Sequence, residues 1–489
     1  MRTLYRNGRV RTPAAPYATA LVVDGDTVSW VGDEDGAAGQ TGARTVDLAG
    51  ALLAPAFVDA HVHCTSTGLA LTGLDLRTAR SLADALAAVE RAATAARGRP
   101  VLGFGWDDTR WPERRAPTAR ELDRASFGGA VYLARVDAHS AVVSSALMAA
   151  VAGLADRPGF RADGWQRGKA HDAVRLAAFA LVTPAQRRAA QLAALRHAAS
   201  LGIACVHEMA GPVISSADDL AALLAPAEGD GPLPEVIGYW AELFGIDTAR
   251  ELGAVGAAGD LFCDGSLGSH TAALTAPYAD RPDSSGDLKL ATDDVAEHVV
   301  RCTEAGLQAG FHAIGDAAVD QVLAGVELAS ARLGRPVGAG HRVEHVEYVR
   351  DAARLAASGL VASMQPGFDA LWGGPDRMYA ERLGAARAGE LNRFAALAAA
   401  GVPLAFGSDS PVTDLGPWAA VRAATHPTDP AAALPADAAF AAHTRGGWRA
   451  ANRPSEGVLT PGAPATFAVW QGETCELTVR RGVAVFSTR

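Results

Sequence analysis

The two ends of the chain alternate apolar and polar residues with the period of two that is typical of β-strands. Near the N-terminus the segment TALVVDGDTVSWVG shows this alternation, and NG and DGD are turn signals. The tail from about Val458 repeats it in GVLTPGAPATFAVW and CELTVRRGVAVF. We therefore expect residues 1–50 to form a small antiparallel sheet and residues 456–489 to form further short strands.

The middle of the chain, residues 51–455, alternates short apolar runs with alanine-rich segments of helical character. Helices such as Pro184–Ser200 and Thr292–Gly306 begin with capping or first-turn residues and end near glycine. Repeated strand–helix units favour a parallel sheet covered by helices, and their number favours a (β/α)₈ barrel over an open sheet. The candidate strands are Phe57–Ala60, Val131–Val136, Ile203–Val206, Val236–Tyr239, Leu261–Cys263, Gln308–Phe311, Arg342–Glu344, Leu360–Ser363 and Pro403–Phe406.

One stretch interrupts this alternation. Residues from about Ser66 to Thr183 are rich in Arg, Asp, Gly, Pro and Trp, with less regular periodicity. We interpret the stretch as a long insertion after the first barrel strand rather than as a separate domain.

Composition narrows the class of protein. Of 489 residues, 49% are hydrophobic and 20% charged, which is ample for a large core. The 44 basic and 54 acidic residues give a net charge of −10, which argues against a nucleic-acid or anionic-membrane partner. Five scattered cysteines favour a reducing compartment, and no apolar run is long enough for a signal peptide or a membrane span. We expect a cytoplasmic protein with a small-molecule substrate; a homodimer stays open.

Histidines follow several of the predicted strands. His61 and His63 end the first strand, His312 and His345 follow later ones, and Asp409 follows the last. Residues i and i+2 of a strand point to one face, and a (β/α)₈ barrel carries its chemistry at the carboxyl ends of its strands. A His-x-His pair alone is often a solvated pair. Because further imidazoles and a carboxylate follow other strands, these residues together favour a metal site for zinc, or for manganese, iron or nickel.

The chain also resembles a known family in eight stretches that occur in the family's order. The likeness is to the metal-dependent amidohydrolase superfamily, and most closely to its branch of N-substituted formamide deformylase-like proteins. The matching stretches are LLAPAFVDAHVH, LARVDAHSAVVSSAL, GIACVHEMAG, FCDGSLGSHTAAL, GFHAIGDAAVD, HRVEHVEYV, SMQPGFDALW and LAFGSDSPV.

This resemblance implies a barrel with a small β-sandwich formed from both chain ends, and it assigns roles to five residues. His61 and His63 correspond to first-strand metal ligands, His312 to the fifth-strand ligand, His345 to the sixth-strand histidine and Asp409 to the eighth-strand aspartate. In the family a metal-bound water attacks an amide or another polarised carbon, and the last aspartate accepts its proton.

The expected function is therefore hydrolysis of a carbon–nitrogen bond other than a peptide bond, in an amide or an N-substituted formamide. Hydrolysis of a lactone or ester and deamination of a ring are alternatives at the same site. A metal-free barrel that binds a small molecule without turnover is a further alternative from another class of protein.

Asp260 marks a departure from the family pattern. Much of the family carries there a lysine that is carboxylated by CO₂ and bridges two metals, and aspartate cannot be carboxylated in this way. We favour one metal per chain, held by His61, His63, His312 and Asp409, with His345 on the water or substrate. A second metal, held by Asp260, Glu208 or Cys263, is the alternative; Cys263 is otherwise a buried free cysteine.

Weaker candidates remain near other strand ends. His139, in VDAHSAV, is a candidate substrate contact or a hydrogen-bonded loop histidine. Further residues are candidates either for the pocket lining or for a structural role, and they are His207, His270, Trp106, Asp107, Trp111 and Gln365. The other histidines are interpreted as structural or surface residues, and they are His171, His197, His298, His341, His426 and His443.

Overall fold

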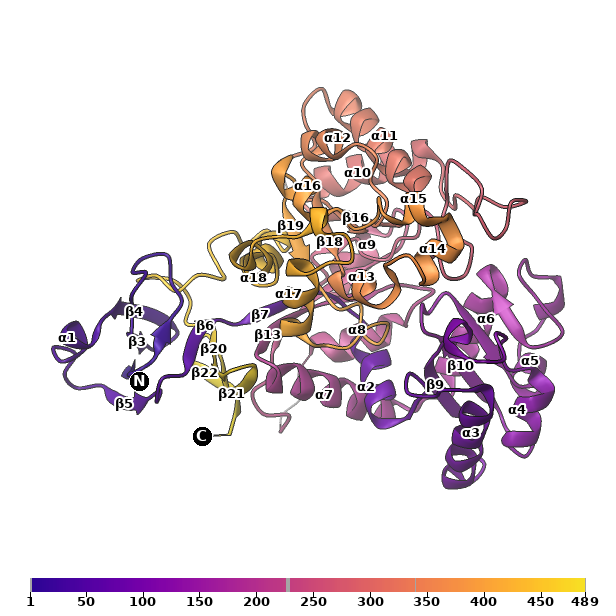
Figure 1. The fold of residues 1–489 in the computed structure, drawn as a ribbon, viewed down its shortest axis with the longest axis horizontal. Coiled ribbons are helices and arrows are strands. Elements are labelled where there is room, and N and C mark those ends of the chain that lie inside the picture. The colour runs from indigo at the N-terminus through magenta and orange to yellow at the C-terminus, as the bar shows by residue number, and fades with distance from the viewer. Residues whose placement is uncertain (1, 226–228, 339, 489) are drawn as a thin grey trace.

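A barrel of eight parallel strands forms the centre of the molecule (Figure 1). The computed structural model describes residues 2–225, 229–338 and 340–488. Successive barrel strands are neighbours, and a parallel bridge between Val62 and Ser410 joins the first to the end of the last. This is the expected (β/α)₈ barrel. The strands are β7 (Phe57–Val62), β13 (Ile203–Ala210), β14 (Glu235–Trp240), β15 (Gly256–Ala257), β16 (Gln308–Ala313), β17 (Arg342–His345), β18 (Val361–Met364) and β19 (Leu404–Phe406).

One predicted strand lies outside the barrel sheet, and another is not a strand. Val131–Val136 falls on β10 (Val131–Arg135), which belongs to a different sheet. The fourth barrel strand is β15 rather than Leu261–Cys263, where Phe262 makes only an isolated bridge to His312. A Gly-Ala strand carries no hydrophobic signal to detect, whereas Leu-Phe-Cys is a continuous apolar run.

Helices surround the barrel strands and pack against them in one large apolar cluster. Both helices that the sequence predicted are present. At α7, Thr183 and Gln186 form a capping box with Pro184 in the first turn, and α10 is followed by Gly306 in the left-handed region. The helices of this part are α2 (Cys64–Thr72), α7 (Pro184–Ser200), α8 (Ala217–Leu224), α9 (Ile246–Glu251), α10 (Thr292–Ala305), α11 (Asp316–Leu333), α12 (Ala352–Ser358), α13 (Pro366–Trp372), α14 (Met378–Leu383), α15 (Ala385–Ala388), α16 (Phe394–Ala399), α17 (Pro417–Thr425), α18 (Ala436–Ala442) and α19 (Arg445–Ala450).

The insertion between β7 and α7 is more regular than expected. It forms a five-stranded sheet with helices and has apolar clusters of its own, one of them built around Trp106 and Trp111. Figure 1 shows it as a lobe at the lower right, beside the barrel. Its two- and three-residue edge strands are too short to leave a period in the sequence. Its elements are β8 (Leu74–Asp75), α3 (Leu82–Ala96), β9 (Val101–Trp106), α4 (Ala119–Ala125), β10, β11 (Ser140–Val143), α5 (Ser145–Ala149), β12 (Trp165–Arg167) and α6 (Gly168–Ala180).

Both chain ends build the sheets at the opposite side of the barrel, where both termini lie (Figure 1). One apolar cluster joins Leu21 and Leu53 of the N-terminal part to Phe467 and Val479 of the C-terminal part. The first sheet is β4 (Thr27–Gly32), β3 (Ala20–Asp24), β1 (Arg2–Arg6) and β5 (Arg44–Asp47), and the second is β2 (Arg9–Val10), β6 (Leu52–Pro55), β20 (Phe467–Gln471), β21 (Thr474–Arg480) and β22 (Val483–Ser487). The first is not wholly antiparallel as expected, because β5 pairs with β1 in parallel.

All five cysteines are free and buried. Within the described residues, no helix combines the length and the apolar character needed to cross a bilayer.

Candidate active site

Four histidines and two aspartates meet at the carboxyl ends of the barrel strands. All six side chains are buried. They come from five different strand ends, so the barrel and not local sequence brings them together. They are His61 in β7, His63 directly after it, Asp260 shortly after β15, His312 in β16, His345 at the end of β17 and Asp409 shortly after β19.

Asp260 lies at the centre of this cluster. Its Oδ2 is 3.2 Å from Nε2 of His63 and 3.5 Å from Nε2 of His61. Its Oδ1 is 3.4 Å from Nδ1 of His312 and 3.4 Å from Nε2 of His345. One carboxylate therefore faces two histidine pairs, with one oxygen toward each pair.

Asp409 completes the side of the cluster formed by the first strand. Its Oδ1 lies 3.1 Å from Nε2 of His63 and 3.5 Å from Nε2 of His61. Neither Asp409 Oδ1 nor His61 Nε2 has a hydrogen-bond partner among the described residues, although both atoms are buried. Buried polar atoms are costly without a partner, and a cation between them would supply one.

The outer ring nitrogens of the four histidines are all held by acceptors. Because each acceptor is an oxygen, each outer nitrogen donates its N–H, and the inner nitrogen keeps its lone pair for the cluster. The four bonds run from His61 Nδ1 to Glu344 Oε2 at 2.9 Å, from His63 Nδ1 to the Met209 carbonyl at 2.9 Å, from His312 Nε2 to the Gly265 carbonyl at 3.0 Å and from His345 Nδ1 to Gln365 Oε1 at 2.9 Å.

These side chains fit a divalent cation. Three overlapping sets place their ligand atoms within 4.8 Å of one another, and these are His61–His345–Asp409, His61–His63–Asp260 and Asp260–His312–His345. Neutral imidazole nitrogens and carboxylate oxygens are the usual ligands of zinc. Burial by itself would lower the pKa of His63. The neighbouring carboxylates of Asp260 and Asp409 outweigh this effect and raise the pKa of His63 to about 9. A bound cation would take the place of that proton.

The backbone is left-handed at two of these positions. The φ angle is +69° at His345 and +53° at Asp409, a region that residues other than glycine seldom adopt. In a regular strand, Glu344 and His345 would point to opposite faces. Because the chain turns at His345, both successive side chains face the cluster. Glu344 contacts His61, and His345 contacts Asp260.

A small cavity lies directly beside the cluster. His345 and Asp409 line it on one side, and most of the rest of its wall is apolar and aromatic. Its free volume is about 20 Å³, close to the room that one water molecule needs. The remaining lining residues are Asp137, His139, Ser266, Leu267, Gly268, Ile314, Glu347, Phe368, Trp372, Met378, Tyr379 and Val412.

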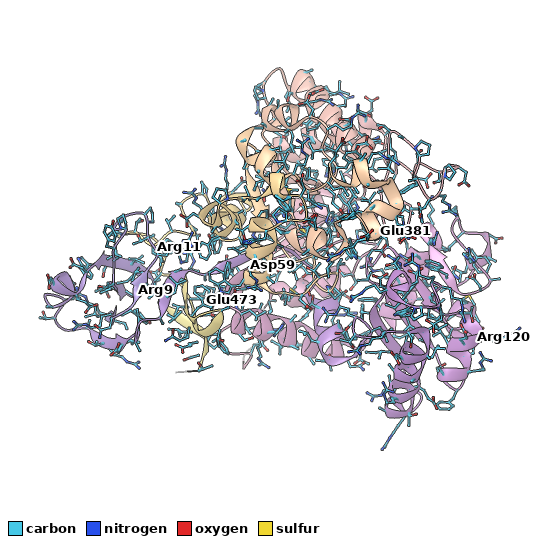
Figure 2. The ribbon with its side chains drawn as sticks, viewed as in Figure 1. Arg9, Arg11, Asp59, Arg120, Glu381 and Glu473 are labelled. Atoms are coloured by element: carbon cyan, nitrogen blue, oxygen red, sulfur yellow. The ribbon has the colours of Figure 1, made fainter. Side chains whose placement is uncertain are left out.

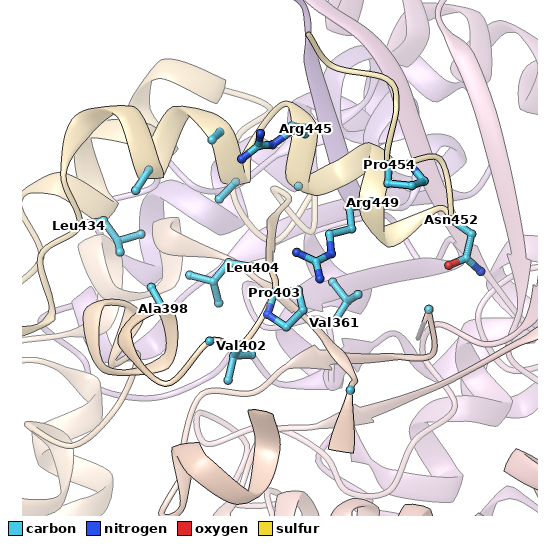
Figure 3. A pocket seen from close by; sticks show the side chains of 17 residues that line it. Val361, Ala398, Val402, Pro403, Leu404, Leu434, Arg445, Arg449, Asn452 and Pro454 are labelled. Atoms are coloured by element: carbon cyan, nitrogen blue, oxygen red, sulfur yellow. The ribbon is translucent and has the colours of Figure 1, made fainter. Parts of the chain in front are cut away.

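A much larger cavity, of about 790 Å³, lies at the other end of the barrel. Val361 and Leu404, the first residues of β18 and β19, line it, so it is at the amino ends of these strands. Figure 3 shows Arg445 and Arg449 among the side chains that surround it. The size of this cavity does not make it the site of chemistry, because the candidate ligands lie at the carboxyl ends.

Comparison with known proteins identifies the family. The profile described as "Amidohydrolase family" matches residues 44–486, nearly the whole chain. The chain belongs to the amidohydrolase family. A metal-dependent hydrolase of known structure resembles this amidohydrolase over nearly its whole length, and the cluster of histidines and aspartates is a candidate metal site.

Individual relatives cover most of this amidohydrolase. The protein LONG AFTER FAR-RED 3 of Arabidopsis thaliana is 28% identical, over 95% of the chain and 86% of its own length. The putative amidohydrolase YtcJ of Bacillus subtilis is 26% identical, over 87% and 83%. The crystal structure of an uncharacterized metal-dependent hydrolase from Pyrococcus furiosus has a TM-score of 0.75 at 28% identity and covers 97% of this chain and all of its own. The N-substituted formamide deformylase of Arthrobacter pascens matches only 29% of the chain and 28% of its own length, at 29% identity.

The weaker candidates separate into two groups. His139 lies beside the cluster, with its ring 5.1 Å from that of His312, and it lines the small cavity. Gln365 holds His345. By contrast, Trp106 and Trp111 are buried in the core of the insertion, so of the two roles considered for them it is packing that the structure shows. Large indoles flanked by polar residues look alike in sequence whether they pack or bind.

Asp107 lines an outer cleft rather than the cavity beside the cluster. This cleft, of about 780 Å³, lies between the insertion and the segment from α13 to α14. Arg114 and Glu381 form an ion pair across it, and Figure 2 labels Glu381 at this junction. Trp372 and Met378 line both the cleft and the small cavity, so the two spaces share a wall.

Other sequence candidates lie outside the ligand sets that the described residues form. Glu208 accepts the backbone N–H of Cys64, and burial raises the pKa of Glu208 to about 7. Burial likewise raises the pKa of the Cys263 thiol. The remaining candidates, His207 and His270, have partners outside the cluster. His207 pairs with Arg342, and His270 pairs with Asp280.

Sequence reasoning missed three residues of this site. Glu344 holds His61 and also pairs with Arg342 inside the barrel. Glu347 and Tyr379 are hydrogen-bonded to each other in the wall of the small cavity. The alternation of Arg342 and Glu344 along one strand was a detectable signal, because two charged residues on one inward face need each other as partners.

Proposed function

We propose that this amidohydrolase hydrolyses the carbon–nitrogen bond of a small amide, other than a peptide bond. The observation that carries the proposal is the set of four inward-facing imidazole nitrogens and two carboxylates beside a cavity at the carboxyl end of the barrel. An N-substituted formamide is the first substrate class to test. The partial likeness to the deformylase supports that class, but only over less than a third of the chain.

Two divalent cations are favoured at this site over the single one expected from the sequence. One would be held by His61, His63 and Asp409, the other by His312 and His345, with Asp260 between them. The supporting observation is that each oxygen of Asp260 faces a different histidine pair. Zinc is the first ion to test, because imidazole and carboxylate are its common ligands. When bound, such a cation lowers the pKa of water and polarises a carbonyl oxygen.

Asp409 is the residue to which we assign proton transfer. Its carboxylate belongs to the cluster and also lines the cavity, so it can meet both the water and the substrate. It would accept the proton of the attacking water and return it to the departing nitrogen. His345 lines the same cavity, and its hydrogen bond to Gln365 fixes its orientation toward Asp260 and the substrate.

The assignment is tested with an Asp409→Asn variant and a substrate panel. Asp414, five residues further on and exposed, provides the matched control Asp414→Asn. We expect the zinc-loaded protein to release amine from an N-alkylformamide or N-alkylacetamide. We expect Asp409→Asn to lower kcat by about 10²–10⁴-fold and Asp414→Asn to leave it unchanged. A lactone and an aminopyrimidine complete the panel; turnover of either one alone, or of none, would overturn the amide assignment.

A further inference from the structure

The small cavity beside the cluster holds one acid without a counter-charge. Three carboxylates line it, and no lysine or arginine does among the described residues. Asp137 pairs with Arg135 at 2.9 Å, and Asp409 belongs to the histidine cluster. The third, Glu347, accepts the hydroxyl of Tyr379 and forms no ion pair with a lysine or arginine in the described part of the chain.

Glu347 has unused capacity to accept hydrogen bonds. It is 4% exposed, and Tyr379 beside it is 1% exposed, so little water can serve it. A carboxylate offers about four lone-pair positions, and the hydroxyl of Tyr379 occupies one. Since a buried carboxylate without a cationic partner is costly, a ligand that brings N–H donors or a positive charge would be stabilised there.

An aromatic wall connects this acid with the cluster. The ring of Phe368 is stacked on that of His345, with centroids 5.9 Å apart and an angle of 11° between the planes. The ring centroid of Trp372 lies 4.9 Å from that of Phe368, and the ring centroid of Tyr379 lies 6.2 Å from that of Trp372. Aromatic faces together with an acid are the surroundings that favour an organic ammonium group.

We propose that this cavity binds the amine side of the substrate, as an ammonium or N–H group on an apolar substituent, with Glu347 as acceptor. The inference rests on the proposed function, since hydrolysis of R–CO–NH–R′ by one water gives R–COOH and R′–NH₂. At neutral pH the acid gives up a proton and the amine gains one, so the released product is R′–NH₃⁺. The substrate class is therefore an amide with an apolar or aromatic N-substituent rather than one with an anionic N-substituent.

Such a ligand needs more room than the cavity has at rest. Its free volume is about 20 Å³, whereas the neighbouring cleft has about 780 Å³. Trp372 and Met378 form the shared wall, and methionine has an unbranched side chain that adapts readily. Binding therefore displaces these two side chains toward the cleft.

The test is calorimetric binding of benzylammonium and of its uncharged analogue benzyl alcohol to the zinc-loaded protein. We expect wild type to bind benzylammonium at least about tenfold more tightly, as a charged hydrogen bond would give. Glu347→Gln is expected to remove that preference while retaining the acceptor for Tyr379. Glu390→Gln is the matched control, because Glu390 accepts the hydroxyl of Tyr348 at 2.9 Å but is exposed and does not line the cavity.

Each outcome supports or overturns the inference. Equal affinity of wild type for both ligands would overturn it, as would a preference that survives in Glu347→Gln or disappears in Glu390→Gln. If Glu347→Gln does not fold, Glu347→Asp serves instead and should reduce the preference, because the shorter side chain withdraws the carboxylate from the ligand. Failure of the proposed function is distinguishable: a protein that prefers benzylammonium but hydrolyses no amide contradicts the function, whereas hydrolysis without the preference contradicts the inference.

Discussion

Nδ1 of His61 lies 2.9 Å from Oε2 of Glu344, and both side chains are fully buried. The same glutamate pairs with Arg342, and together the two residues hold its pKa at about 2 against the opposing effect of burial. Glu344 therefore stays an anion and fixes the His61 ring with its N–H outward. The inner nitrogen of His61 is left to face Asp260 and Asp409.

Glu344→Gln should weaken metal binding although Glu344 is not a proposed ligand. Loss of the charge behind His61 makes its inner nitrogen less basic, and we expect about a 10–100-fold loss of zinc affinity. The variant also leaves Arg342 buried without its partner, which should lower the free energy of unfolding by about 3–5 kcal/mol. Chelator competition and denaturant unfolding measure the two effects.

The control for this prediction is Glu327→Gln. Glu327 also pairs with an arginine, Arg354, but on the surface of the protein. The Glu327→Gln variant should leave zinc affinity unchanged and alter the free energy of unfolding by at most about 1 kcal/mol. Unchanged zinc affinity in a folded Glu344→Gln variant would refute the positioning role.

Asp260→Asn should reduce the metal content of the protein. The amide retains the size of the side chain but removes the charge between the two histidine pairs. We expect elemental analysis to give about two zinc ions per chain in the loaded wild type and at most one in the variant. Asp283→Asn, at an exposed position, should retain the wild-type content. A wild-type content of one would restore the mononuclear site that the sequence favoured.

Asp137→Asn should destabilise the contact between the insertion and the barrel. Asp137 accepts the hydroxyls of Ser266 and Ser269 from the loop after β15, and it pairs with Arg135 of its own sheet. Because these groups are buried, we expect a loss of about 1–3 kcal/mol in the free energy of unfolding, measured in denaturant. The exposed Asp163→Asn in the same insertion should cost less than about 1 kcal/mol. Equal effects of the two variants would mean that this contact does not hold the insertion in place.

Much of the barrel could be predicted because its signals are local. His61 and His63 stand two apart at the end of an apolar run, and strand geometry alone puts them on one face. The fourth strand could not be predicted from Gly256 and Ala257, since neither residue carries a β signal. The sheet of the insertion was likewise hidden, because its edge strands have two and three residues.

The acids around the cluster were harder to predict for a different reason. Glu344 and Glu347 lie in the quoted HRVEHVEYV stretch, but an acid in sequence is usually a solvated surface residue. Only the fold reveals that one supports His61 and that the other faces an aromatic cavity. The left-handed backbone at His345 also breaks the alternation on which strand reasoning relies.

The most direct test of the central claim is to titrate zinc into the chelator-stripped enzyme while following amine release from N-benzylformamide. The account predicts no turnover without metal and a rise in activity that reaches its plateau near two equivalents per chain. Turnover by the stripped protein, or none at any zinc, manganese or nickel concentration, would contradict a metal-dependent amide hydrolase at this cluster.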